Sequence, residues 1–333
     1  MRGPILGGMD THVPGDTDMR ARQGSAVVFP GMGPTPFSEV ARFMLVNPYA
    51  RQLLATADEV LGYRLTDRYQ QTEGDYSVYG QISFVVNCLA LARWAEERLE
   101  IRPDLVAGPS FGGRAASVYA GVLDFADAVR MTARLAEVMD EYFAAEHPEL
   151  VTQSMARLPE EKLRLLREEL QERGEFHDLA CVVDRDFFML TVREGVLEEL
   201  QQRIRSLGGM PLYTMKPPMH SHLFGPLRER VDAEIFSGLT WSDPLLPVVA
   251  DQDGRTLTTG AEVRGMLLDG FVRTVRWPDV VAALTGAGVD TLHVAGQDGL
   301  FTRVAATTRA FRVRPVTPQS VMRPVRRRPA VLV

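Results

Sequence analysis

The chain of 333 residues has few cysteines, almost no lysine and no long apolar run. Cys88 and Cys181 lie far apart in the sequence, so the disulfide framework of a small secreted domain is not expected. No apolar run reaches the roughly 18 residues that a membrane-spanning helix needs. The N-terminus lacks the charged-then-apolar pattern of a signal peptide. We therefore expect a cytoplasmic protein without membrane contact.

Lysine is scarce, and negative charge outweighs positive charge. The formal net charge is −6, and Lys162 and Lys216 are the only lysines among 37 cationic residues. A net negative charge argues against nucleic acid as a partner. The arginines reflect either the codon usage of a GC-rich genome or sites that clamp phosphate or carboxylate groups, and the sequence leaves both open. With 45% apolar and 24% charged residues, the composition is that of a globular protein large enough for two subdomains.

The most informative segment is the pentapeptide at residues 108–112, which reads GPSFG. It fits the nucleophile-elbow pattern Gly-x-Ser-x-Gly, in which a sharp turn between a strand and a helix exposes a serine hydroxyl. An apolar strand at 105–107 precedes it and a helix at 113–119 follows it, as the motif requires. Ser110 is therefore a candidate nucleophile for acyl transfer, and a plain glycine turn is the alternative.

Strand and helix patterns alternate along most of the chain, which favours a parallel sheet with helices on both faces. We expect a flexible lead at 1–24 and a Pro/Arg-rich tail at 315–333. The large domain would comprise 25–148 and 222–314. Its expected strands are at 25–29, 105–107, 248–250 and 291–294, and its expected helices at 38–61, 80–99, 113–119, 124–143, 262–271 and 278–286.

Residues 149–221 have a different character. Strand patterns at 151–158, in 180–192 and at 211–215 alternate with charged helical patterns at 159–173 and 194–206. This β-α-β-β-α-β order is typical of a ferredoxin-like module. We predict that the module is inserted into the large domain.

A serine nucleophile needs a general base and an oxyanion hole. Of the six histidines, His220 and His222 are the best candidates, because they lie where the inserted module returns to the large domain. A polar hinge is the alternative reading of this segment. The backbone N–H groups of Phe111 and Met32 are the expected oxyanion donors.

With these features in order, the chain resembles the malonyl-CoA:acyl-carrier-protein transacylase family over about residues 25–310. Besides the elbow, five segments resemble segments of the family and occur in the same order along the chain. They are FPGMG at 29–33, Gln81, AGVLDFADAV at 120–129, Ser221-His222, and VRW at 275–277.

The resemblance implies an α/β-hydrolase-like large domain with a parallel sheet and an inserted ferredoxin-like small domain. It implies that Ser110 is the nucleophile and His222 the general base, oriented by a main-chain carbonyl near Gly270. Family members pass the acyl group to the thiol of a phosphopantetheine arm. No bound cofactor or metal is therefore expected, and carrier proteins are the expected donor and acceptor.

The chain departs from the family pattern at positions that are expected to contact the acyl group. Malonyl-type members carry a carboxylate-binding arginine 25 positions after the serine, where this chain has Leu135. Arg134 is adjacent, but one helical step turns a side chain by about 100°. Pro109, Met32 and Gly270 also replace polar family residues. We predict a pocket formed by Gln81, Pro109, Leu135, His220 and Gly270.

These departures are similar to those of the discrete acyltransferases of macrolactam polyketide pathways, of the vicenistatin dipeptidyl transferase type. That resemblance implies transfer of an uncarboxylated aminoacyl or dipeptidyl starter from a stand-alone carrier protein to the loading carrier domain of a polyketide synthase. A malonyl-type transacylase, a carrier-protein thioester hydrolase and a non-catalytic docking protein are the alternatives.

Carrier proteins are acidic, so a basic docking surface with an apolar spot is expected. Arg157 and Met210 on the small module and Arg303 in the large domain are the candidates. Ordinary surface arginines and a buried methionine are the alternative.

Overall fold

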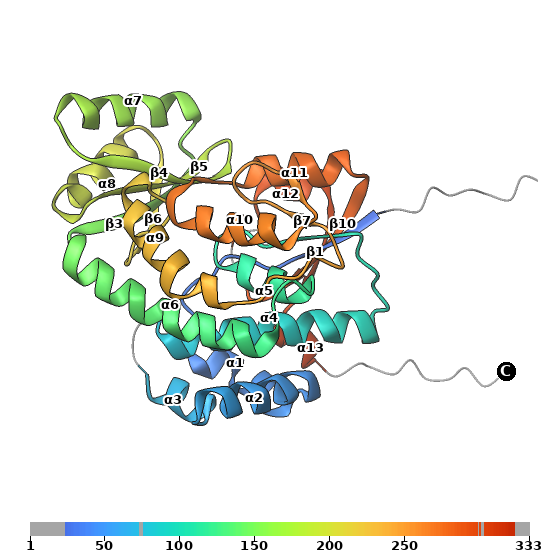
Figure 1. The fold of residues 1–333 in the computed structure, drawn as a ribbon. Coiled ribbons are helices and arrows are strands. Elements are labelled where there is room, and N and C mark those ends of the chain that lie inside the picture. The colour runs from blue at the N-terminus through green and yellow to red at the C-terminus, as the bar shows by residue number, and fades with distance from the viewer. Residues whose placement is uncertain (1–23, 73–75, 299, 301–302, 324–333) are drawn as a thin grey trace, which may run out of the picture.

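The computed structural model describes residues 24–72, 76–298, 300 and 303–323 (Figure 1). The predicted lead lies outside the described residues except for Gly24, which begins the first strand. Most of the predicted tail, from residue 324 on, also lies outside them.

The main sheet has six strands in the order β11-β10-β1-β2-β7-β8. All neighbours pair in parallel except β7 and β8, which are antiparallel, so the predicted, mostly parallel sheet is confirmed. The strands are β1 (Gly24–Val28), β2 (Leu105–Ala107), β7 (Val248–Val249), β8 (Thr256–Leu257), β10 (Val289–Ala295) and β11 (Arg312–Val316).

The predicted start of the tail at 315 is wrong. Pro315 lies in β11, opposite Val294 of β10. Since β11 is an edge strand, proline is tolerated there although it lacks a backbone donor.

Helices cover both faces of this sheet (Figure 1). Val27 of β1 packs with one set of helices, whereas Ala26 and Val28 point to the other, as strand alternation requires. The first set is α1 (Phe37–Val46), α2 (Pro48–Leu61), α3 (Leu65–Gln71), α4 (Val78–Arg98) and α5 (Gly112–Tyr119), and the second is α11 (Trp277–Gly286) and α12 (Ala305–Ala310). A short helix, α13 (Pro318–Val321), follows β11.

The helix expected at 38–61 is in fact two helices. Asn47 ends α1 and caps α2, since its side chain accepts hydrogen bonds from the backbone N–H groups of Tyr49 and Ala50. Pro48 takes the first helical position, where its missing N–H has no consequence.

A third group of helices packs around one apolar cluster that reaches the small sheet at Leu150. Its members are α6 (Phe125–Glu146), the one-turn helix η2 (His222–Phe224), α9 (Gly225–Glu234), η3 (Phe236–Gly238) and α10 (Gly260–Val272).

The small sheet has the order β6-β3-β5-β4-β9, and its first four strands are antiparallel. Strand and helix order and pairing are those of the predicted ferredoxin-like module. Its elements are β3 (Leu150–Ala156), α7 (Glu160–Glu172), β4 (His177–Asp184), β5 (Phe187–Arg193), η1 (Glu194–Val196), α8 (Leu197–Ser206) and β6 (Met210–Met215). The fifth strand, β9 (Val275–Arg276), pairs in parallel with β4 and joins this sheet to the large part of the chain.

Candidate active site

Ser110 occupies the turn between β2 and α5, as the elbow pattern predicts. Its φ is +55°, a left-handed conformation that is strained for a residue other than glycine. The flanking glycines are required sterically. A Cβ on Gly108 would lie 2.3 Å from the carbonyl oxygen of Gly112, and one on Gly112 would lie 2.2 Å from that of Phe29. This turn leaves Ser110 exposed, although the residues around it are mostly buried.

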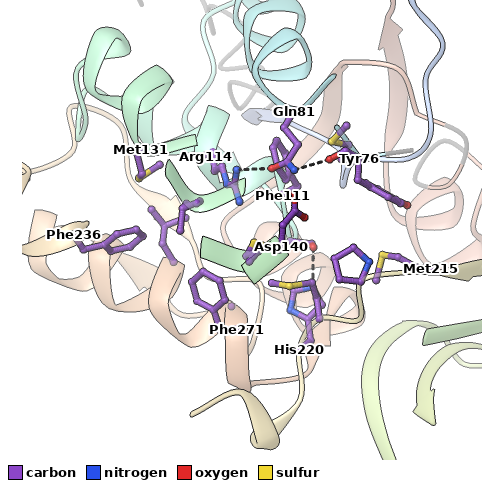
Figure 2. A pocket seen from close by; sticks show the side chains of 18 residues that line it. Tyr76, Gln81, Phe111, Arg114, Met131, Asp140, Met215, His220, Phe236 and Phe271 are labelled. Carbon is purple, nitrogen blue, oxygen red and sulfur yellow. Dashed lines mark hydrogen bonds between the residues drawn. The ribbon is translucent and has the colours of Figure 1, made fainter. Parts of the chain in front are cut away.

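His220 is the histidine that contacts the serine. Its Nε2 lies 2.8 Å from Ser110 Oγ (Figure 2). The ring is buried, and burial lowers the pKa of His220 to about 4, while the Gly270 carbonyl opposes that shift. The Gly270 contact is weak, because Nδ1 makes no hydrogen bond of ordinary geometry. The imidazole is therefore neutral at physiological pH, as a general base must be.

The prediction that His222 is the general base is wrong. His222 begins η2, its side chain is 70% exposed, and its Nδ1 lies 2.7 Å from Asp178 Oδ2. The same carboxylate accepts hydrogen bonds from Ser221 Oγ and from the His222 backbone N–H. Ser221 caps the one-turn helix, which turns His222 outward while His220 reaches the serine from the preceding loop.

Asp251 is a site residue that the sequence reasoning missed. Its Oδ2 accepts a hydrogen bond of 2.6 Å from the backbone N–H of Ser110. Burial raises the pKa of Asp251 to about 7. A signal was present, since Asp251 follows the apolar strand β7, and ligand sites of parallel sheets lie beyond the carboxyl ends of their strands.

The loop after β1 lies against the elbow. A Cβ on Gly31 would be 3.6 Å from the carbonyl oxygen of Pro109 and 3.9 Å from Ser110 Cβ. Met32 and Phe111 both border the same cavity as Ser110. The two residues expected to supply the oxyanion donors therefore lie at the same cavity as the nucleophile.

Ser110 and His220 open into a cavity of about 110 Å³ that is partly open to solvent (Figure 2). Four of the five predicted pocket residues line it: Gln81, Leu135, His220 and Gly270. Pro109 does not. It is buried within the elbow, where its carbonyl accepts a hydrogen bond from the Gly112 N–H.

The wall formed by α6 is mostly apolar. Leu135 is buried at the position where malonyl-type relatives were expected to carry arginine. Arg134 points away and pairs with Glu137 and Glu234. The cavity nevertheless contains one arginine, Arg114, which the sequence reasoning also missed.

The three predicted docking residues are exposed. Arg157 follows β3, and its neighbour Ala156 pairs with Met210 across the sheet, so Arg157 and Met210 are close. Met210 is 41% exposed rather than buried. Arg303 lies elsewhere in the sequence, just before α12 of the large part of the chain.

Neither a membrane-spanning helix nor a metal-binding cluster is found among the described residues. No described helix is long and apolar enough to cross a bilayer. No group of three or more His, Cys, Asp or Glu side chains within the described ranges is arranged to hold a metal ion.

Comparison with known proteins finds similar acyltransferases. Residues 154–215 match the family model of the VinK acyltransferase small domain. The malonyl CoA-acyl carrier protein transacylase of Escherichia coli K12 is 26% identical over 283 residues, which cover 83% of this chain and 90% of the relative. That of Bacillus subtilis 168 is 25% identical over 277 residues, or 81% and 86% of the two chains.

Solved structures share the fold. A malonyl-transacylase in complex with its type II polyketide synthase acyl-carrier protein (PlMCAT:AntF) superimposes with a TM-score of 0.79 at 24% identity, covering 90% of this chain and 97% of that one. The acyltransferase domain from the second module of the salinomycin polyketide synthase gives 0.73 at 25% identity, covering 89% and 69%. The chain is an acyltransferase, similar in sequence and fold to the malonyl-CoA:acyl-carrier-protein transacylases.

Proposed function

We propose that this acyltransferase moves an uncarboxylated, amino-acid-derived acyl group from one carrier protein to another through an ester on Ser110. The observation that carries the proposal is the cavity beside the Ser110–His220 pair, whose wall has Leu135 in place of a carboxylate-binding arginine. The proposed donor is a stand-alone carrier protein, and the proposed acceptor is the loading carrier domain of a polyketide synthase.

In the first half-reaction, His220 Nε2 takes the proton of Ser110 Oγ as the oxygen attacks the thioester carbonyl. The backbone N–H groups of Phe111 and Met32 would stabilise the resulting oxyanion. When the tetrahedral intermediate collapses, the C–S bond breaks and the imidazolium returns its proton to the departing thiolate. The products are the Ser110 ester and the free thiol of the donor's phosphopantetheine arm.

The second half-reaction runs the same steps in reverse with a new thiol. His220 deprotonates the acceptor's phosphopantetheine arm, and the sulfur attacks the Ser110 ester. The C–O bond then breaks and Ser110 recovers its proton. Both arms are supplied by carrier proteins, so neither free coenzyme A nor another cofactor enters the scheme.

Asp251 has a positioning role in this scheme. Ser110 is held in a left-handed conformation, and the hydrogen bond from its N–H to Asp251 fixes the backbone there. Because that backbone sets the direction of Oγ, Asp251 would maintain the 2.8 Å contact with His220.

Two observations support carrier proteins as partners. One similar solved structure is that of a transacylase with its acyl-carrier protein, and residues 154–215 match a VinK small domain. Arg157 and Met210 lie side by side on that domain, with Leu212 and Tyr213 also exposed on β6. An apolar spot beside a cation suits an acidic, helical carrier, and Arg303 would contact it from the large domain.

A malonyl-type transacylase remains the second candidate, because the similar curated proteins bear that name. Malonyl would have to be bound without an arginine at Leu135, so that Arg114 would be the arginine left to meet its carboxylate in the cavity. An isolated carboxylate is costly to bury unless a cation pairs with it.

Intact-protein mass spectrometry tests the proposal. The enzyme is mixed with a glycyl-β-alanyl-loaded carrier protein and an unloaded acceptor carrier. An adduct on the enzyme, followed by the acyl group on the acceptor, is the expected result, and Ser110→Ala should abolish both. Release of free acid would indicate a thioester hydrolase, and no adduct at all would indicate a docking protein.

A further inference from the structure

Arg114 is a buried cation in the wall of the acyl cavity. It is only 8% exposed and lies one helical turn after Ser110 in α5. Its guanidinium carbon stands 4.0 Å from the centre of the Phe111 ring, and Nη1 donates a hydrogen bond of 3.2 Å to Gln81 Oε1 (Figure 2). No ion pair joins Arg114 to a carboxylate among the described residues, and burial alone lowers its pKa, to about 9.

Gln81 fixes the guanidinium without neutralising it. The Gln81 amide is itself oriented, because its Nε2 donates a hydrogen bond of 2.8 Å to the carbonyl oxygen of Tyr76. Its Oε1 is therefore the atom presented to Arg114. A guanidinium has five N–H donors, and the hydrogen bond to Gln81 uses one of them. A charged donor held in a cavity wall with donors to spare is suited to a ligand oxygen.

We propose that Arg114 is a specificity-determining residue that donates hydrogen bonds to the amide carbonyl oxygen of the acyl chain, with Gln81 holding the guanidinium in place. This inference rests on the proposed function, since it names the group of the amino-acid-derived acyl chain that the pocket recognises. The acyl chain starts at Ser110, so a group one helical turn away lies within a few bonds of the thioester.

The rest of the cavity favours an amide over a carboxylate as the acceptor. Asp140 lines the same cavity, and no ion pair of its side chain is found in the described structure. Partial desolvation raises the pKa of Asp140, although the residue remains exposed at the edge of the cavity. A malonyl group would meet Arg114 but be repelled by Asp140. An acyl chain with an amide and a terminal ammonium group would be attracted by both.

The test compares two carrier-bound acyl groups of equal chain length, glycyl-β-alanyl and heptanoyl, and also malonyl, on the wild type, Arg114→Met and Arg114→Lys. The rate of acylation of Ser110 is measured by rapid quench and intact-protein mass spectrometry. Arg114→Met should slow glycyl-β-alanyl acylation about 10- to 30-fold, as expected for the loss of a charged hydrogen bond. Heptanoyl acylation should stay within about threefold, and Arg114→Lys should restore part of the selectivity.

Each of the other possible results would contradict a different part of the proposal. An equal loss for both acyl groups would show that Arg114 is only structural, and no loss for either would show that it is not used. A loss confined to malonyl-loaded carrier would make Arg114 a carboxylate clamp, contrary to the inference. If the wild type accepts heptanoyl but not glycyl-β-alanyl, the proposed function fails together with the inference, whereas the serine chemistry stands.

Discussion

Ser110 Oγ lies 2.8 Å from Nε2 of His220, a buried ring that burial keeps neutral. His222 is only two residues further along the chain, yet its exposed ring is bound to Asp178. Two neighbouring histidines therefore have different environments, and of the two His220 has the contact with the serine that a general base needs.

Replacing the two histidines separately tests this assignment. His220→Ala should slow acylation of Ser110 by a heptanoyl thioester about 10²- to 10⁴-fold, the usual contribution of a general base. His222→Ala should change the rate by less than about threefold, because an exposed pair such as His222–Asp178 contributes little. Stopped-flow release of the thiol gives both rates. The reverse order of effects would restore His222 as the base.

The pH dependence of acylation follows from the low pKa of His220. Its imidazole gains a proton only near pH 4, so kcat/KM for acylation should stay level from pH 8 to about 5 and fall below that. The native state resists this protonation, whereas the unfolded chain takes up its proton near pH 6.5. His220 should therefore lower the free energy of unfolding as the pH falls from 6.5 to 4. A midpoint of acylation near 6.5 would contradict the burial of the base.

The titration of Asp251 should affect the free energy of unfolding in the opposite direction to that of His220. The pKa of Asp251 is raised from 3.8 to about 7, so the native state retains a proton that the unfolded chain loses, and stability should fall as the pH rises through this window. Asp251→Asn removes the titration but keeps an oxygen that can accept from the Ser110 N–H. The melting temperature of Asp251→Asn should therefore rise relative to that of the wild type as the pH increases from about 4 to about 7.

Asp251→Ala is the matched control for positioning. It removes the acceptor and leaves the Ser110 N–H without this partner. Acylation should fall about tenfold, whereas Asp251→Asn should stay within about threefold of the wild type. If both variants acylate equally, the hydrogen bond does not position the nucleophile.

Charge reversal tests the proposed docking surface. Arg303→Glu should raise the KM for carrier-bound substrate several-fold, because carrier proteins are acidic, and should leave acylation by a small heptanoyl thioester unchanged. Arg309→Glu is the matched control, an exposed arginine on the neighbouring helix α12. Identical carrier kinetics for Arg303→Glu and the wild type would exclude a docking role for Arg303.

Regular patterns in the sequence predicted most of the fold. The strand before Ser110, the glycines that flank it and the β-α-β-β-α-β order of the small module were all readable, because each depends on local periodicity or local sterics. Strand β11 was missed, since Pro315 and its flanking arginines resemble a surface tail and only pairing with β10 makes them a strand.

The site was predicted less completely, for physical reasons. His220 lies in an irregular loop at a φ of +62°, and no periodic pattern tells which of two nearby side chains in such a loop faces the serine. Ser221 gave a usable signal, because a capping serine places His222 in the first turn of a helix. Arg114 and Asp251 act through burial, which a single sequence does not show.

The central claim is that the Ser110 pocket selects an uncarboxylated, amine-bearing acyl group. A direct test offers the wild-type enzyme equal amounts of glycyl-β-alanyl- and malonyl-loaded carrier protein and measures the mass of the enzyme within the first turnovers. The account predicts that the glycyl-β-alanyl adduct on Ser110 exceeds the malonyl adduct at least about tenfold, the equivalent of one poorly paired buried carboxylate. A predominant malonyl adduct would contradict it.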